Sequence, residues 1–338
     1  MPKEVSTPKQ SAGGGYTFAD KVAATFLLKM LAGTPPIDAE TGQIESVRFE
    51  KRVDGWFLDD IVLFLSRLDD GAAAVAISVK SNTQVTEAGF PADFTKAIWE
   101  QRLHVQSEKF DVSRDFVALA TPSLDIAVRS AWDGLLTKAL DADPIEFADR
   151  ITTPKYDNEI GRAIFASLNC PEAIDSSKTP IDTTILLKRL RHFPFDFESN
   201  PSEDENACIM GCGRLLRDGG LDDSSSLWTH LKQIAREVAT SGGDLTRTQL
   251  ADRLRATFSL NEFPNYSSDW SKISDDFRVR TERIRGKLAG TLEIARDETI
   301  TSYREQPLTV LVGSSGSGKT VLAKNIAVAA AKDGHAMW

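Results

Sequence analysis

The chain has 338 residues, and 40 lysines and arginines against 49 aspartates and glutamates give it a formal net charge of −9. A hydrophobic share of 41% with 26% charged residues excludes disorder throughout, and the length predicts about two or three domains. No apolar run approaches the ~20 residues that span a bilayer. We therefore expect a soluble, cytoplasmic protein without membrane association. The mild acidity argues against a nucleic-acid coat protein but allows an enzyme with a local basic groove.

Three cysteines, Cys170, Cys208 and Cys212, are too few for a disulfide framework and are typical of a reducing compartment. Cys208 and Cys212 are four residues apart and would share a helix face. Because no second cysteine pair or His-x3-His motif accompanies them, we interpret them as core residues rather than as zinc ligands. The four histidines (His104, His192, His230 and His335) are scattered without triad partners, so nucleophilic Ser-His-Asp chemistry has no support.

The first 125 residues predict a small α/β unit. Residues 1–14 are polar and glycine-rich, and we expect them to be disordered. The pattern that follows predicts a helix over 16–31, strands over 44–49, 57–65 and 72–80, a helix over 94–106 and a strand over 116–120. The turn Asp69-Asp70-Gly71 is typical of a hairpin between the second and third strands. We place the boundaries of this domain at residues 15 and 125.

Residues 126–300 predict a mainly helical connector. Leu227, Leu231, Ile234 and Val238 share one face of a predicted helix, and we expect Glu203 to Glu205 to form an acidic loop. The segment from Leu245 to Leu254 has the pattern of the short helix in a helix-turn-helix or winged-helix unit.

That segment has two interpretations. Arg247, Arg253 and Arg255 are close enough together for DNA reading. The interpretation that we favour is a spacer with solvated arginines.

The strongest motif lies in residues 301–338, which we predict to begin a P-loop NTPase domain. An apolar strand, 308–312, runs into Gly313-Ser314-Ser315-Gly316-Ser317-Gly318-Lys319-Thr320 and then into an alanine-rich helix over 321–332. In this strand–loop–helix context the backbone N–H groups would cradle the phosphates of ATP. Lys319 would reach the β- and γ-phosphates, and Thr320 would coordinate Mg²⁺.

Trp338 follows this helix with no room for the Asp-bearing strand that a P-loop domain needs for Mg²⁺. We therefore expect the P-loop domain to be truncated here and the chain to be the N-terminal part of a longer protein. NTPase activity is then expected of the full-length protein only.

A second candidate site lies in the α/β unit. Asp59 and Asp60 precede one strand, and Ile77-Ser78-Val79-Lys80 ends the strand paired with it. Period-two alternation places Ser78 and Lys80 on one face, with Val79 on the other, and only one of the two aspartates can share that face; we favour Asp60. A carboxylate there would hold Mg²⁺ or Mn²⁺ against a phosphodiester, and Lys80 would position the attacking water. The alternative is that the aspartates are turn residues and Lys80 is a solvated strand end.

The element order is that of the PD-(D/E)XK nuclease superfamily, whose fold is restriction-endonuclease-like. The segments Gly15-Tyr16-Thr17-Phe18, Phe49-Glu50, Leu58-Asp59-Asp60-Ile61-Val62 and Ile77-Ser78-Val79-Lys80 resemble the dsDNA endonuclease domains of CD-NTase-associated effectors. They are also similar to the nuclease caps of STAND-type antiviral ATPases, in which a nuclease precedes a NACHT-like NTPase. The resemblance covers about residues 15–122.

This resemblance implies a metal-dependent endonuclease with Asp59 or Asp60 and Glu50 as metal ligands, Lys80 at the attacking water and Ser78 at the third position of the site. The family usually carries Glu, Asp or Gln where this chain has Ser78, and a hydroxyl binds Mg²⁺ more weakly than a carboxylate. Glu50 or Asp20 would then supply the acid. We interpret Trp56 and Trp99 as core residues rather than base-stacking platforms.

We therefore predict an antiviral effector that cuts double-stranded DNA once the full-length protein binds ATP and assembles as a homo-oligomer. Two alternatives stay open. The α/β unit is a catalytically inactive DNA-binding or oligomerisation module, or it is only an interaction domain of a P-loop signalling or transport ATPase.

Overall fold

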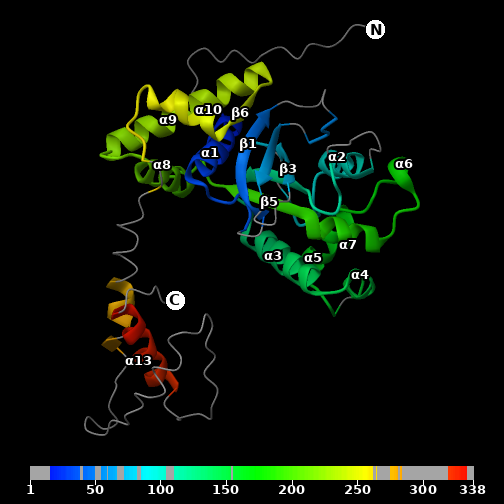
Figure 1. Ribbon diagram of the computed structural model, residues 1–338. Coiled ribbons are helices and arrows are strands. Elements are labelled where there is room, and N and C mark those ends of the chain that lie inside the picture. Colours follow the sequence, from blue (N-terminus) through cyan, green and yellow to red (C-terminus); the bar gives the residue numbers. More distant parts are fainter. Residues whose placement is uncertain are drawn as a thin grey trace. The chain divides into compact units, whose positions relative to one another are not determined.

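The computed structural model describes residues 16–38, 41–49, 55–58, 60–66, 72–81, 85–103, 110–153, 155–261, 264, 275–280, 282–283 and 319–332 (Figure 1). The chain divides into two compact units, Met1–Pro264 and Asn265–Trp338. The fold is a mixed α/β fold. Its described elements in the first unit are α1 (Phe18–Ala32), β1 (Gln43–Phe49), β2 (Ile61–Ser66), β3 (Ala72–Val79), α2 (Ala92–Leu103), β4 (Phe116–Pro122), α3 (Ile126–Asp141), α4 (Pro144–Ile151), α5 (Glu159–Ser167), α6 (Glu172–Asp175), α7 (Pro180–Arg189), β5 (Leu190–Phe195), α8 (Glu203–Leu215), α9 (Leu221–Ser241), β6 (Asp244–Thr246) and α10 (Arg247–Arg255).

Local chemistry fixes both ends of α1. Thr17 and Asp20 form a capping box, in which each side chain accepts a hydrogen bond from the backbone N–H of the other. Gly33 ends the helix at φ +66°, a conformation that glycine adopts without a Cβ penalty. The predicted start at Tyr16 is thus two residues early because Thr17 is the cap.

A six-stranded sheet in the order β5-β4-β3-β2-β1-β6 organises the first unit. The strands β1, β2 and β3 are antiparallel neighbours, and β6 pairs antiparallel with the outer side of β1. β3, β4 and β5 run parallel, so their carboxyl ends meet at one edge of the sheet. This edge is where the candidate site lies.

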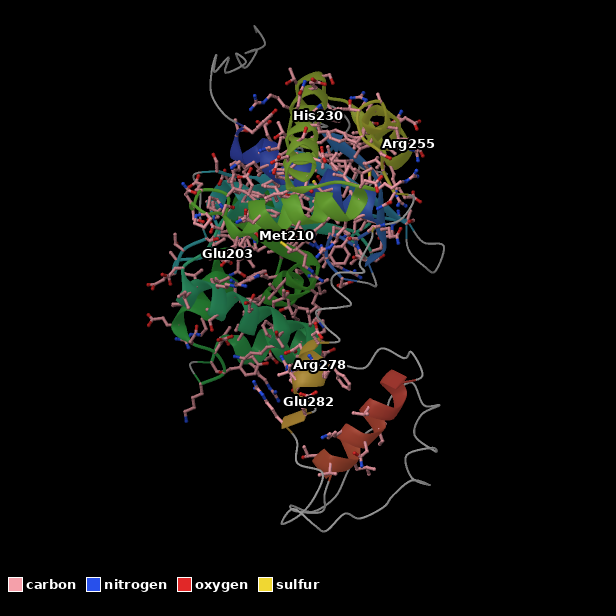
Figure 2. All side chains as sticks on the ribbon, turned by 90° about the vertical axis from the view of Figure 1, so that its left-hand side faces the viewer. Glu203, Met210, His230, Arg255, Arg278 and Glu282 are labelled. Carbon is pink, nitrogen blue, oxygen red and sulfur yellow. The ribbon has the colours of Figure 1, made fainter. Side chains whose placement is uncertain are left out.

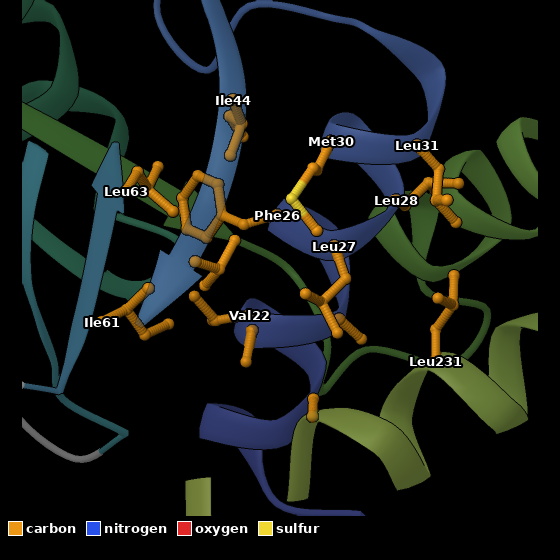
Figure 3. Close-up of a cluster of buried hydrophobic side chains, with 14 of the residues drawn as sticks. Val22, Phe26, Leu27, Leu28, Met30, Leu31, Ile44, Ile61, Leu63 and Leu231 are labelled. Carbon is orange, nitrogen blue, oxygen red and sulfur yellow. The ribbon is translucent and has the colours of Figure 1, made fainter. Parts of the chain in front are cut away.

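Helices cover both faces of the sheet (Figure 1), and each face has its own hydrophobic core. On one face, α1 packs between the sheet and α8, α9 and α10, and Figure 3 shows Val22 and Phe26 directed at Ile61 and Leu63. On the other face, α2, α3, α5 and α7 cover Val62, Ala76 and the residues beside them. Alternate residues of β2 and β3 therefore enter different cores, as the period of a strand requires.

The structure confirms the predicted order of the first six elements, from α1 to β4. It also adds two strands, β5 and β6, from the region that we assigned to a helical connector, so the sheet extends past the predicted boundary at residue 125. Pro194 lies in β5 and cannot donate a ladder hydrogen bond. The strand tolerates it because β5 is at the edge of the sheet.

The acidic residues at 203–205 were wrongly predicted to form a loop. They form the first turn of α8, where Ser202 caps the helix and negative side chains interact favourably with the helix dipole. Glu205 also accepts hydrogen bonds from Lys21 at 2.9 Å, Trp228 at 2.9 Å and Lys232 at 3.0 Å. This carboxylate therefore joins α1, α8 and α9.

The second unit is described over few residues. Its helix α13 (Lys319–Lys332) includes two buried apolar side chains, Leu322 and Ile326. A bilayer-crossing segment is not found among the helices that the structure describes.

Candidate functional site

Asp60 lies next to Ser78 at the open end of the β2–β3 pair. Ile61 pairs with Ile77, so the preceding residue of β2 lies opposite Ser78. Asp60 Oδ2 accepts hydrogen bonds from Ser78 Oγ at 3.2 Å and from the backbone N–H of Val79 at 2.6 Å. Among the described residues none donates to Asp60 Oδ1. The carboxylate is thus oriented through one of its two oxygens.

Lys80 lies on the same face, directly after β3. Its backbone N–H donates to Ala120 O at 3.0 Å, which continues the ladder between β3 and β4 past the strand end. Its ammonium Nζ lies 3.8 Å from Asp93 Oδ2 on α2, and the two side chains are 36% and 68% exposed. An ion pair this exposed is weak, so Lys80 can turn to an anionic ligand.

The predicted alternation is confirmed. Ser78 lies on the face that carries Ala76, whereas Val79 packs against the core on the α1 face. Ser78 is 7% exposed, and Asp60 and Lys80 are partly exposed. A buried hydroxyl, a carboxylate and a lysine therefore line one corner of the sheet.

The parallel strands extend this corner with two residues that the sequence did not reveal. Ser78 pairs with Leu119, which makes Thr121 of β4 the neighbour of Lys80 on the same face. His192 of β5 lies within hydrogen-bond distance of Thr121, with Nε2 2.8 Å from Oγ1. Burial lowers the pKa of His192 to about 4, so the imidazole is neutral at pH 7. The strand of His192 gives little local signal, because two polar residues stand together at Arg191-His192 and Pro194 disfavours a strand.

Of the three other predicted acids, the structure describes one, and that one is not part of this corner. Glu50 and Asp59 lie outside the described residues. Asp20 belongs to the cap of α1, on the opposite face, and its Oδ2 lies 2.6 Å from Arg236 Nη2. Asp20 therefore holds α1 to α9 and cannot replace the missing carboxylate at Ser78.

The described residues fit a divalent cation only in part. Groups of three or more His, Cys, Asp or Glu side chains suited to a metal are not found within the part of the chain that the structure describes. Mg²⁺, however, keeps several waters and often takes only one or two protein carboxylates. Asp60 supplies one such carboxylate, and Ser78 Oγ is an oxygen beside it.

Other residues singled out in the sequence are structural. Trp56 and Trp99 are 1% and 0% exposed and cannot stack on a base, as predicted. Trp99 Nε1 donates to Leu168 O at 2.8 Å, which ties α2 to the end of α5. Cys208 and Cys212 are buried in the α1-side core, also as predicted.

The P-loop motif is described only at its end. Residues 313–318 lie outside the described residues, and α13 begins at Lys319, the motif's lysine. Thr320 is exposed in the first turn of that helix. A helix in this position is what the motif requires, while the loop itself stays a prediction.

No protein-family model matches the chain, and no curated protein matches it. Solved structures that resemble it include the Cap4 SAVED/CARF-domain containing receptor of Acinetobacter baumannii with the cyclic trinucleotide 3′3′3′-cAAA (14% identity, 70% of this chain and 43% of that chain, TM-score 0.40). The same receptor with 2′3′3′-cAAA has the same identity and TM-score, with 71% and 45% covered. A third structure of this receptor has 13% identity, 70% and 45% covered and a TM-score of 0.40. The chain spans less than half the length of these proteins, and the scores are too low to establish a shared function.

Proposed function

We propose that the first unit is a metal-dependent DNA endonuclease whose site is the corner formed by Asp60, Ser78 and Lys80. The observation that carries this proposal is the orientation of Asp60. One carboxylate oxygen is fixed by Ser78 Oγ and Val79 N–H, and Lys80 lies on the same face of the sheet. Such a carboxylate could hold Mg²⁺ or Mn²⁺ against a phosphodiester, and a lysine beside it could offset the charge that develops on the phosphate.

Each residue has a role in this proposal. Asp60 would hold the cation through its second oxygen, with Ser78 Oγ as a weak additional ligand. The bound cation would offset negative charge on the phosphate. Lys80 would leave its exposed partner Asp93, orient the attacking water and stabilise the charge that develops on the phosphorus oxygens. Glu50 and Asp59 remain proposed ligands.

The proposed context is antiviral defence, and it rests on the resemblance of residues 15–122 to the nuclease domains of such effectors. ATP and Mg²⁺ would bind at residues 313–320, with Lys319 and Thr320 in the roles that their motif predicts. Nucleotide would gate assembly of the full-length protein as a homo-oligomer in the cytoplasm, rather than drive DNA cleavage.

Plasmid cleavage tests the nuclease. Supercoiled DNA is incubated with the chain and Mg²⁺ or Mn²⁺, beside Lys80→Ala, Asp60→Asn and an EDTA control. The matched control is Lys96→Ala, which removes an exposed lysine of α2 that pairs with Glu100. We expect nicking or linearisation to require metal, to fall at least 100-fold in the first two variants and to persist in Lys96→Ala. Equal cleavage by Lys80→Ala would contradict the proposal.

A second candidate function is a DNA-binding or assembly module without catalysis. It is favoured by Ser78, which stands where a nuclease of this type carries a carboxylate or amide, and by the single carboxylate of the described site. It predicts DNA binding that EDTA and Lys80→Ala leave unchanged. If the full-length, triggered protein binds DNA and cuts none, this function replaces the first.

A further inference from the structure

A cavity of about 290 Å³ lies on the α1 side of the first unit, away from the carboxyl edge of the sheet. Its walls are the end of α1 at Leu31, the end of α8 at Leu215, one face of α10 and the segment that contains Leu260 and Asn261. This volume is close to the lower limit of small-molecule sites, which span roughly 300–1,000 Å³. It admits a ligand of mononucleotide size.

One wall of the cavity is cationic. Arg247 and Arg255 both line it, and Thr248 lies between them on the same helix. Figure 2 shows Arg255 at the surface of α10. The nearest opposing charge is Asp252, whose Oδ1 lies 3.1 Å from Arg255 Nη1 with both side chains more than 60% exposed. Such a pair contributes little, so the arginine can be shared with a ligand.

The carbonyl groups at the two helix ends are already satisfied. Arg247 Nη2 donates to Leu31 O at 3.0 Å. The backbone N–H of Asn261 donates to Leu215 O at 2.7 Å, and its Nδ2 donates to the carbonyls of Arg214 and Leu216. Within the described residues, the remaining N–H groups of Arg247 and the Thr248 hydroxyl can donate to a ligand, and Asn261 Oδ1 can accept from one.

We propose that this cavity binds a phosphate monoester of mononucleotide size. Arginine forks match the oxygens of a phosphate and bind it through two N–H groups at once. Arg247 and Arg255 hold the phosphate with the Thr248 hydroxyl. Leu31, Leu215 and Leu260 provide an apolar wall for a planar ring. The site shares no residue with the proposed nuclease site or with the P-loop motif, so it does not rest on the proposed function.

Calorimetric titration with 5′-AMP tests the proposal. The whole chain is used with EDTA present and with Lys319→Ala, so that neither a metal site nor the P-loop contributes. We expect saturable binding that weakens at least tenfold in Arg255→Ala and several-fold in Thr248→Val. Arg253→Ala is the matched control, because Arg253 is exposed on the same helix but does not line the cavity. Its affinity should equal that of the parent.

Inorganic phosphate and adenosine separate the two halves of the ligand. We expect each to bind at least tenfold more weakly than 5′-AMP. If inorganic phosphate bound as tightly as 5′-AMP, the proposed contact between the apolar wall and the ring would be wrong. No binding of 5′-AMP, or equal binding by Arg255→Ala with an unchanged melting temperature, would overturn the site itself.

Discussion

Thr121 Oγ1 and His192 Nε2 lie 2.8 Å apart on the neighbouring strands β4 and β5. The threonine hydroxyl has one hydrogen, and it is donated to Pro122 O at 2.9 Å. When the hydroxyl donates to Pro122 O, His192 donates to the hydroxyl oxygen through Nε2–H. This pair lies at the carboxyl edge of the parallel strands, where Thr121 is opposite Lys80 in the extended register of β3 and β4.

His192 makes the stability of the first unit depend on pH. Burial lowers the pKa of His192 from 6.5 to about 4. Between these values the unfolded chain binds a proton that the folded chain does not, so stability is lost as the pH falls from 6.5 toward 4. The wild type should lose about 2–3 kcal/mol more than His192→Gln between pH 7 and 4.5, measured by urea unfolding. His230→Gln, on α9, is the control, and parallel pH profiles of wild type and His192→Gln would contradict this assignment.

Glu205 gives the α1 side of the unit an acid-sensitive contact. Its hydrogen bonds from Lys21, Trp228 and Lys232 overcome the cost of burial and hold its pKa at about 2. A lowered carboxyl pKa stabilises the fold above the unfolded value of 4.5, and this stabilisation is lost as the pH falls toward 2. The side chain of Glu205 is 25% exposed, so solvent screens these contacts in part, and Glu205→Gln should cost about 1 kcal/mol at pH 7.

The measurement for Glu205 is urea unfolding at pH 7, 5 and 3.5. The difference between wild type and Glu205→Gln should shrink at the lowest pH. Glu203→Gln, which replaces an exposed acid in the same turn of α8, should match the wild type throughout. A constant difference at all three values would show that the contact does not depend on the charge of Glu205.

The sequence was sufficient for the α/β class and for the first six elements because their signals are local. Phe18, Val22, Phe26 and Met30 mark a helix by spacing alone, and all are buried in it. The placing of Ser78 and Lys80 on one face likewise follows from the period of a strand. The placing of Asp60 beside Ser78 follows from the register of a single hairpin, the one formed by β2 and β3.

What the sequence could not show depends on partners distant in the chain. His192 reaches Thr121 across 71 positions, and β6 joins β1 from almost 200 residues away. Asp20 precedes the strands β1, β2 and β3 and resembles a free acid in the sequence, yet its partner is Arg236 on α9. No local sequence pattern predicts the pairing of Asp20 with Arg236. The structural role of Asp20 could therefore be recognised only from the fold.

Gly89 is held where a side chain cannot fit. Its φ is +105°, and an added Cβ would overlap the side chain of Ser167 and lie 3.1 Å from Ala163 O. Ser167 cannot move easily, since its hydroxyl accepts from Phe90 N and donates to Ile164 O. Gly89→Ala should therefore destabilise the unit by about 2–4 kcal/mol in thermal or urea unfolding.

Gly134 is the matched glycine for that experiment. It lies inside α3, and an added Cβ would meet nothing within 4 Å. Gly134→Ala should stabilise the unit by about 0.5–1 kcal/mol because alanine restricts the unfolded chain and favours the helix. If both variants changed stability in the same direction, the close packing of α5 on Gly89 would be the wrong explanation.

Replacing Ser78 by aspartate tests the metal site without requiring cleavage. Ser78→Asp places a second carboxylate beside Asp60, whose Oδ2 now lies 3.2 Å from the serine hydroxyl. In EDTA the two like charges repel, so the melting temperature should fall by several degrees. With millimolar Mn²⁺ the pair becomes a better cation site, and the variant should gain more stability from metal than the wild type does. Ser81→Asp, an exposed position just after Lys80, should show neither effect. A Ser78→Asp protein with the same melting temperature in EDTA and in Mn²⁺ would exclude a metal site at this corner.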